Sequence, residues 1–382
     1  MMNKIKNLVM LCATLGVLGS PPALAEVVVG VSVSTTGPGA SLGIPEKNAV
    51  ALFPTTIAGE TVRYVVLDDG SDPSTATKNA RKFVSEEKAD VLVGSAVTPA
   101  SAAIAQVAFE TGTPHIALSP VTLPADRGHW VFRTPQHNSV MAGALVGHMQ
   151  SAGVKTLGFI GFADAYGDEW LAALEPLLQK AGIKIVQAER FARNDTSVTG
   201  QVLKLVGAKP DAIIVVGSGS PAALPQTTLV ERGYKGQVYQ THAVANQAFL
   251  SVAGKAAEGV ILPVGPVVVV DQIPADHPSK EIGSAFVRRY EEKYGAGTFS
   301  SFAGHAHDVF RLLEAAVPVA LKTAAPGTAE FRLALRDALE TNKEVVGAHG
   351  VYNMSAEDHF GLDTRGRVLV RIENGGYSMI GQ

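Results

Sequence analysis

Short apolar runs rich in β-branched residues alternate with helical patterns along most of this chain. In the first part, four such runs are separated by helical segments at 46–53, at 72–87, where Asp72 can cap the helix ahead of Pro73, and from Thr98 onward. This alternation predicts a parallel sheet with helices on both faces. The expected strands of this first unit are 27–34, 62–67, 91–94 and 115–118.

The same alternation then restarts, which predicts a second unit of the same kind. The fold class that follows is α/β, with two Rossmann-like, doubly wound lobes. Open sheets of this type bind ligands at the carboxyl ends of their strands, so a ligand cleft is expected between the lobes. The second unit has expected helices near 167–181, 198–207 and 221–232, and expected strands at 155–160, 184–188, 212–216, 237–240 and 260–262.

A Pro/Gly-rich stretch at 263–278 leads into elements that cannot form a third core. These elements must pack on the two earlier sheets, so the chain is expected to cross between the lobes more than once and to form a hinge. They are helical patterns near 279–294, 303–323 and 328–340 and strands near 351 and 368–372. We expect the first lobe to comprise 26–137 and 270–348, and the second lobe 138–269 and 349–382.

The first 25 residues predict a secretory signal peptide. Lys4 and Lys6 precede an apolar run at 8–18 that is too short to span a bilayer, and a small-x-small cleavage site ends at Ala25. We expect cleavage after Ala25, a periplasmic location and no later membrane insertion, with an uncleaved anchor as the alternative. Cys12 is the only cysteine, so the exported chain would contain no disulfide or thiolate. The net charge of −3, without a basic stripe, argues against nucleic-acid binding.

Two helix starts, one in each unit, offer a place for an anion. Thr98-Pro99 follows the strand at 91–94, with Thr98 as the expected N-cap, and Ser220-Pro221 follows the strand at 212–216. Free N–H groups and the helix dipole at such a position attract a carboxylate. The alternative is two ordinary capped helices.

Other motifs point to no cofactor and no metal. The segment 37–43 resembles the nucleotide fingerprint G-x-G-x-x-G but misses its last glycine by one position, which indicates a tight ligand-facing loop or a plain turn. His305 and His307 stand two apart in a helical pattern, so they point to different faces and are poorly placed to chelate a metal. The sequence also has no G-x-S-x-G elbow of a hydrolase.

Several stretches, in this order and spacing, resemble the type I periplasmic binding proteins of the branched-chain amino acid (Leu/Ile/Val) branch. The resemblance runs from about 26 to 375 and implies three crossovers, a cleft that closes, and an ABC transporter as partner. The stretches are Val29-Gly30-Val31 with Thr36-Gly37-Pro38, Leu67-Asp68-Asp69 with Asp72-Pro73, Val93-Gly94 with Thr98-Pro99-Ala100, Phe132-Arg133-Thr134-Pro135, and Gly161-Phe162 through Ala165-Tyr166-Gly167.

The resemblance also implies which residues line the pocket. Thr98 and the N–H groups that follow it would hold a ligand carboxylate, and Tyr166 would close over the ligand from the other lobe. The full set of expected ligand-binding residues is Ser41, Leu42, Val97, Thr98, Ser119, Val121, Asn138, Tyr166, Gly219, Ser220 and His242.

Three departures from that family bear on the ligand. His242 stands at or next to the acidic residue that pairs with an α-ammonium, Asn138 stands at a second acidic position, and Gly219 or Ser220 replaces an aromatic residue. A neutral His offers an ammonium one acceptor, and a charged His repels it. The hypothesis is a carboxylate without an α-ammonium, such as an aromatic or keto acid, with space at Gly219 and Ser220. An amino acid held by a shifted acid or by water is the alternative.

The expected function is therefore that of a monomeric solute-binding protein, not an enzyme. It would catch a small carboxylate by lobe closure and present it to the membrane subunits of an ABC transporter. Two rivals stay open. A cleft hydrolase would need a nucleophile–base pair, and a sensor module would need a membrane helix or a signalling domain.

Overall fold

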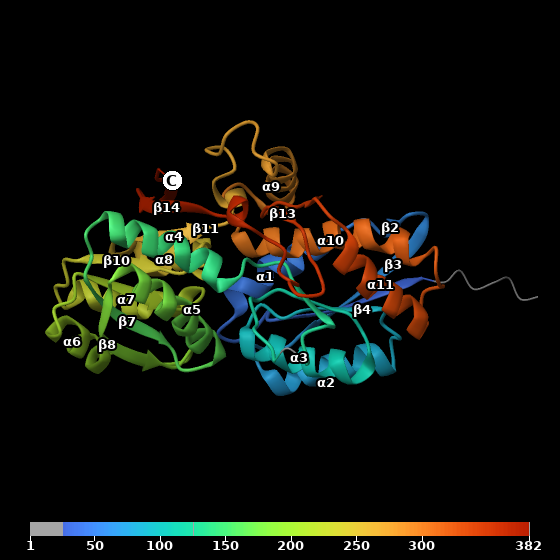
Figure 1. The fold of residues 1–382 in the computed structure, drawn as a ribbon, viewed down its shortest axis with the longest axis horizontal. Helices are drawn as coiled ribbons and strands as arrows, with labels where there is room; N and C mark the ends of the chain where they lie inside the picture. The colour runs from blue at the N-terminus through green and yellow to red at the C-terminus, as the bar shows by residue number, and fades with distance from the viewer. Residues whose placement is uncertain (1–25, 125, 382) are drawn as a thin grey trace, which may run out of the picture.

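The computed structural model describes residues 26–124 and 126–381, so the expected signal peptide and the cleavage site at Ala25 lie outside the described residues. Two α/β lobes lie side by side along the long axis of the molecule (Figure 1). Each is built on its own twisted sheet, as the alternation of strands and helices predicts. Among the described residues, no helix has the length and apolar character needed to cross a membrane.

The first lobe has a six-stranded sheet with the order β2-β3-β1-β4-β5-β6, parallel except for the short β2 at its edge. Alternate residues of β1 face opposite sides of the sheet. Val29 and Val31 pack with α1, α10 and α11, whereas Val28 packs with α2 and α3. The strands are β1 (Val27–Val33), β2 (Thr56–Ile57), β3 (Glu60–Asp68), β4 (Val91–Gly94), β5 (His115–Ala117) and β6 (Val131–Arg133); the helices are α1 (Ala40–Val50), α2 (Pro73–Ser85), α3 (Thr98–Thr111), α10 (Ser301–Ala320) and α11 (Ala329–Thr341).

The second lobe has a seven-stranded sheet with the order β15-β14-β11-β10-β9-β7-β8. Its last two strands, β14 and β15, come from the C-terminal end of the chain and pair antiparallel. Its strands are β7 (Thr156–Phe162), β8 (Lys184–Phe191), β9 (Ala212–Val216), β10 (Gln237–Gln240), β11 (Ile261–Val264), β14 (Val368–Glu373) and β15 (Gly376–Met379); its helices are α4 (Asn138–Ser151), α5 (Ala165–Ala181), α6 (Thr199–Gly207), α7 (Ala223–Glu231) and α8 (Gln247–Ala253).

The chain passes between the lobes three times. The first crossing, at 134–137, joins β6 to α4, and the second follows β11 and leads to α9 (Lys280–Tyr294), which projects from the body in Figure 1. The third leads back to β14. A hairpin of β12 (Val345–Val346) and β13 (Val351–Tyr352) precedes it, and Tyr352 and Leu362 pack in the core of the first lobe. The expected boundary at 348/349 falls inside this hairpin, and we propose that the third crossing follows Leu362.

Two expected element starts are corrected. Helix α1 begins at Ala40, not at 46, so Ser41, Leu42 and Gly43 lie in its first turns and not in a loop. Gly43 looked like a loop residue, but a Cβ at this position would clash with the backbone of Ser34, so glycine lets the helix pack closely against β1. In α3 the N-cap is Val97, and Thr98 is the first helical residue.

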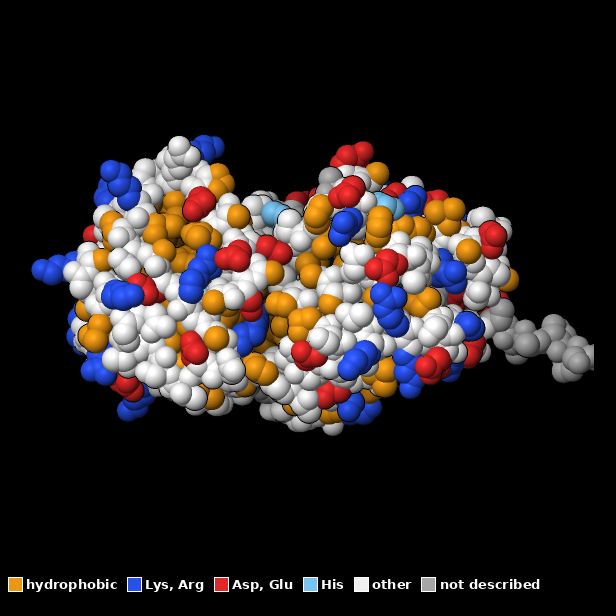
Figure 2. Space-filling view, turned by 90° about the horizontal axis from the view of Figure 1, so that it is seen from below, with side chains coloured by type: hydrophobic (Ala, Val, Ile, Leu, Met, Phe, Trp, Pro, Cys, Tyr) orange, Lys and Arg blue, Asp and Glu red, His pale blue; other side chains and the backbone are white. Residues whose placement is uncertain are grey.

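The molecular surface carries charges of both signs. On the face shown in Figure 2, Lys and Arg side chains are interspersed with Asp and Glu side chains, and apolar patches lie between them. This mixture agrees with the small net charge of −3.

Candidate functional site

A cavity lies between the two lobes at the carboxyl ends of their strands, where the fold predicts a ligand site. Its volume is about 20 Å³, far below that of an open small-molecule pocket, so the two walls lie close together in this arrangement of the lobes. Both lobes contribute to it. The lining residues are Leu42, Ala96, Thr98, Leu118, Ser119, Pro120, Pro135, Tyr166, Arg193, Ser218, His242, Ala243, Phe302 and His305.

The wall from the first lobe presents a helix start and hydroxyl groups. Thr98 is the first residue of α3, a helix of 14 residues, and its side chain is buried. The first N–H groups of such a helix have no intrahelical acceptor and carry the positive end of its dipole. Ser119, in the loop after β5, has a buried Oγ without a protein partner. This wall can donate hydrogen bonds to an anion without carrying a full charge.

The wall from the second lobe presents a guanidinium group. Arg193 Nε donates to Asp164 Oδ2 at 2.6 Å, Arg193 Nη1 donates to Ser218 Oγ at 2.9 Å, and the guanidinium carbon lies 4.1 Å from the centre of the Phe162 ring. Asp164 also accepts the backbone N–H of Tyr166 at 3.0 Å, as the N-cap of α5. The Arg193 side chain is thereby held in one orientation, and its remaining N–H groups are available to a ligand.

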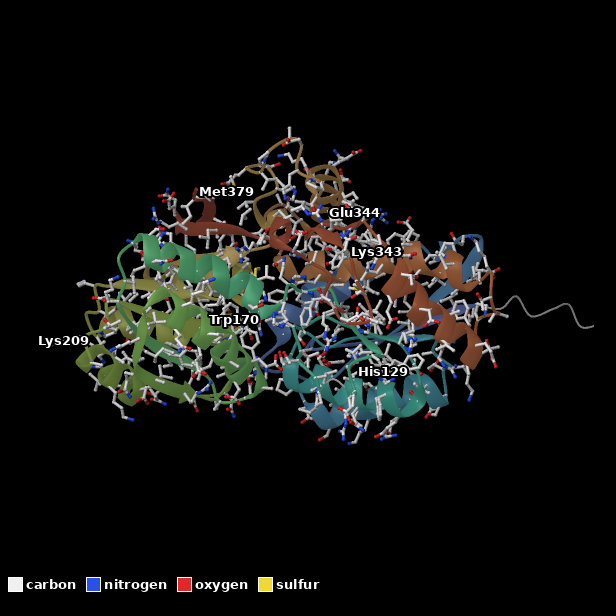
Figure 3. The ribbon with its side chains drawn as sticks, in the orientation of Figure 1. His129, Trp170, Lys209, Lys343, Glu344 and Met379 are labelled. Atoms are coloured by element: carbon white, nitrogen blue, oxygen red, sulfur yellow. The ribbon has the colours of Figure 1, made fainter. Side chains whose placement is uncertain are left out.

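Aromatic side chains of the second lobe form the apolar part of this wall. The Tyr166 hydroxyl donates to Thr241 Oγ1 at 2.8 Å, and Thr241 Oγ1 donates to the Gly217 carbonyl at 2.9 Å. Because the hydroxyl is bonded within the lobe, Tyr166 offers its ring to the cavity. Trp170, labelled in Figure 3, lies on α5 near the boundary between the lobes and contacts both Tyr166 and His242.

Two histidines, one on each side of the cleft, are buried and neutral. Burial, assisted by the nearby His349, lowers the pKa of His242 to about 3. Burial lowers the pKa of His305 well below its usual value, and His349 and His242 act in the same direction. The Nδ1 atoms of His242 and His305 have no protein partner. Unpaired buried polar atoms are costly, so this end of the cavity suits a ligand group that can form hydrogen bonds.

The structure brings together five of the eleven expected residues at the cavity: Leu42, Thr98, Ser119, Tyr166 and His242. Three others form a contact between the lobes instead. The Ser220 backbone N–H donates to Ser41 Oγ at 3.4 Å, and Gly219 lies against Ser41 and Leu42. The remaining three do not line the cavity. Val97 is the N-cap of α3, and Asn138 is the first residue of α4. The Val121 carbonyl accepts a hydrogen bond from Arg133 Nε at 3.0 Å.

The second helix start and the expected space beside it need correction. Ser220 opens a 3-10 turn of three residues, Ser220–Ala222, and its N–H is used by Ser41. Gly219 does not leave room for a ligand, because an added Cβ would clash with Ser41 Oγ and lie 2.6 Å from Leu42 Cδ1. Its φ of +57° also favours glycine. The space left by the missing aromatic residue is thus filled by the first lobe.

Sequence reasoning missed Arg193, Ser218, Phe302 and His305 as lining residues. Arg193 and Ser218 follow β8 and β9, so the rule that ligands meet the carboxyl ends of strands could have found them. The sequence draws attention to His305 only through its spacing from His307, as a possible metal pair. The two rings do point apart, since His305 stacks on His349 and His307 stacks on Phe286. Among the described residues, no group of three or more His, Cys, Asp or Glu side chains could hold a metal ion.

Proteins similar to this chain are known. The family model for periplasmic binding proteins matches residues 26–376. A Leu/Ile/Val-binding protein homolog from Brucella suis is 28% identical over 261 residues, 64% of this chain and 68% of that protein. An extracellular ligand-binding receptor from Rhodopseudomonas palustris is 51% identical, with a TM-score of 0.92 over 93% of this chain and 99% of that chain. An ABC transporter solute binding protein from R. palustris, solved in complex with benzoate, has the same fold at 22% identity, with a TM-score of 0.81 over 93% of this chain and 96% of that chain.

Proposed function

The chain belongs to the periplasmic binding protein family, as a solute-binding receptor of the ABC transporter type, and we propose that its ligand is a small carboxylate without an α-ammonium group, most favourably an aromatic acid. The observation that carries this proposal is the charge of the cavity wall. Its described lining includes Arg193 but no Asp or Glu side chain. An α-ammonium in a closed cleft requires an anion or several acceptors, whereas a carboxylate finds donors here.

The carboxylate is assigned to the part of the cavity where donors from both lobes meet. Thr98, the free N–H groups of the first turn of α3 and Ser119 lie on one side, and the guanidinium of Arg193 lies on the other. Hydrogen bonds to a charged group contribute about 1.5–3 kcal/mol each. A ligand held in this way touches both lobes, so binding favours the closed arrangement.

The rest of the cavity supports an aromatic ligand with a second polar group. Leu42, Leu118, Tyr166 and Phe302 offer apolar surface to a ligand. A hydroxyl group can both donate and accept, so it would match Nδ1 of His242 or His305 in either tautomer. Benzoate is the ligand of the R. palustris protein with the same fold, which is consistent with this ligand class.

Two alternatives are weaker. An aliphatic amino acid, suggested by the name of the Brucella suis relative, would place its ammonium near His242, while the nearby Asp164 already pairs with Arg193 and caps α5. A cleft hydrolase would need a hydroxyl hydrogen-bonded to a base. Among the described residues, no hydrogen bond joins a lining hydroxyl to His242 or His305. We further propose that the mature protein begins at Glu26, acts in the periplasm as a monomer and delivers its ligand to transporter membrane subunits.

A thermal-shift screen tests the ligand class. The protein is refolded to remove carried-over ligand and mixed with benzoate, an aliphatic keto acid, leucine or valine. A ligand at about 100 times its Kd stabilises the folded state by roughly 2.7 kcal/mol, which raises the Tm visibly. We expect the acids to raise the Tm and the amino acids to leave it unchanged. A shift with leucine alone would contradict the proposal.

A further inference from the structure

His349 is fully buried at the place where the three crossings between the lobes meet. It precedes β13, next to the hairpin that leads into the third crossing. Its backbone N–H donates to Asp308 Oδ2 at 2.9 Å, which ties it to α10. Its side chain does not line the ligand cavity.

The first and third crossings meet beside the His349 ring. Gln136, in the first crossing, donates from Nε2 to the Gly366 carbonyl of the third crossing at 2.6 Å. The same Nε2 lies 3.5 Å from His349 Nδ1. His349 Nε2 is 2.9 Å from the Ser301 carbonyl, which can only accept, so the ring proton sits on Nε2 and Nδ1 is an acceptor.

Two glycines, Gly265 of the second crossing and Gly304 of α10, pack closely against the same ring. A Cβ on Gly265, the first residue after β11, would clash with His349 Nδ1 and lie 2.9 Å from Gln136 Nε2. A Cβ on Gly304 of α10 would lie 2.7 Å from His349 Nε2. Only hydrogen atoms at these two positions leave space for the imidazole, so the ring fills a slot formed by separate segments of the hinge.

The face of the ring connects this slot to the ligand cavity. His305 lines the cavity and stacks on His349, with ring centres 3.8 Å apart and an angle of 12° between the planes. A shift of His305 therefore meets His349, and a shift of His349 meets all three crossings. Close-packed elements of this kind transmit displacements instead of absorbing them.

We propose that His349 is a positioning residue that holds His305 against the ligand and joins the three crossings, so that ligand contact at His305 favours the closed hinge. The inference rests on the proposed function only in that a ligand binds in the cavity; it does not depend on whether that ligand is an acid. The stacked pair of His305 and His349 then couples the ligand site to the hinge, in addition to the direct bridging of the lobes by the ligand.

The first test uses the unsubstituted protein. Imidazole ¹⁵N resonances are followed by NMR while benzoate is added. We expect His349 to show the Nε2-protonated tautomer and its signals to move together with those of His305, although His349 does not touch the ligand. Unchanged His349 signals at saturation would overturn the proposal.

The second test measures closure in variants. Spin labels at Lys82→Cys on α2 and Lys180→Cys on α5, both exposed and in different lobes, report the distance between the lobes in the chain from Glu26 onward, which has no cysteine of its own. His349→Gln keeps a donor for the Ser301 carbonyl but removes the stacked ring, and Gly265→Ala disturbs the slot at a compatible φ of −68°. We expect each to lower ligand affinity about tenfold and to leave part of the ligand-bound population open.

Gly200→Ala, on α6 with open space around it, is the matched control and should behave as the unsubstituted protein. Full closure with unchanged affinity in both hinge variants would overturn the role of His349. If the protein binds leucine and not benzoate, the proposed ligand class fails, while the same titrations with leucine still decide the role of His349.

Discussion

The N-terminus of α3 and the turn at Ser220 stand at matching places in the two lobes, each just after a strand of its sheet, and they are used differently. α3 is a helix of 14 residues whose first residue, Thr98, lines the cavity. The turn Ser220–Ala222 has three residues, and its first N–H bonds to Ser41 of the other lobe. One start is left open to a ligand, and the other is closed by protein.

This difference separates recognition from closure. In the function that we propose, the first lobe offers the ligand neutral donors at a helix start, and the second lobe offers the charge of Arg193. The turn at Ser220, with Gly219, instead forms the surface on which the lobes meet. Substitutions at these positions should therefore act on binding through distinct routes.

The largest effect is expected from Gly219→Ala. The new methyl group would clash with Ser41 Oγ and lie 2.6 Å from Leu42 Cδ1, at a φ of +57°. The clash arises only when the lobes close, so ligand affinity should fall about 100-fold. The backbone strain, about 1–3 kcal/mol, is present in the open and the closed form alike and lowers the overall stability instead. Calorimetric titration measures the loss, and Gly200→Ala serves as control. Affinity within threefold of the original would show that closure does not use this contact.

Arg193→Gln should cost about 50-fold in affinity for an acid, because it removes a charged donor from the cavity. Arg190→Gln is the matched control. Arg190 also pairs with a carboxylate, Asp168 at 2.9 Å, and lies over a ring, Phe159 at 5.1 Å, but it does not line the cavity. Calorimetry on both variants separates ligand contact from a general charge effect. Equal losses in the two would contradict the assignment.

Thr98→Val and Ser220→Ala compare the two turn starts directly. Thr98→Val removes one hydroxyl donor to the carboxylate and should lower affinity about tenfold at unchanged Tm. Ser220→Ala should change affinity less than twofold, because the backbone N–H and not the side chain contacts Ser41. Surface plasmon resonance with an immobilised protein measures both. A larger loss for Ser220→Ala would reverse the comparison.

A modest effect is expected from pH. The Thr122 N–H of the first lobe donates to Glu169 Oε1 on α5 at 3.1 Å. Burial raises the pKa of Glu169 to about 7. The nearby charges of Asp164 and Asp168 also raise this pKa, whereas the hydrogen bond from Thr122 and the charge of Arg133 lower it. When the cleft opens, this carboxyl should become exposed and its pKa should fall toward the usual value. The closed form therefore binds a proton more readily than the open form, and closure is favoured as the pH falls below 7.

Ligand affinity should accordingly increase a few-fold, at most about tenfold, from pH 8 to pH 6. His242, with a pKa of about 3, does not titrate in this window. In Glu169→Gln the affinity should stay level across the same range. Calorimetric titrations at pH 6, 7 and 8 decide the point, and an affinity that rises with pH in the unsubstituted protein would contradict the interpretation.

The alternation of strands and helices was sufficient to predict the two sheets and the cleft between them, because parallel sheets of this class have few alternative arrangements. The helix at Pro73, capped by Asp72, was predicted from the same local chemistry that the structure shows, with Asp72 Oδ1 accepting the Thr75 N–H at 2.8 Å. Local patterns failed where packing between distant segments decides. Gly43 serves close packing of α1 on β1, and Gly219 serves the contact between the lobes.

Part of the candidate site was likewise beyond local reasoning. Leu42, Thr98, Ser119, Tyr166 and His242, all among the expected ligand-binding residues, line the cavity. The orientation of Arg193 depends on Asp164 and Ser218, which are 29 and 25 residues away in sequence. The stacking of His305 on His349 joins α10 to the hinge across 44 residues. Such contacts are set by tertiary packing, and a single sequence carries no pattern for them.

The most direct test of the central claim is calorimetric titration with two ligands that differ only in the ammonium group, phenylalanine and 3-phenylpropanoate. Both present the same ring and carboxylate to the wall formed by Thr98, Ser119 and Arg193. We predict that 3-phenylpropanoate binds and that phenylalanine binds at least 100-fold more weakly, because its ammonium would meet neutral histidines and no carboxylate. Tighter binding of phenylalanine would contradict the account and would indicate that the protein binds an amino acid.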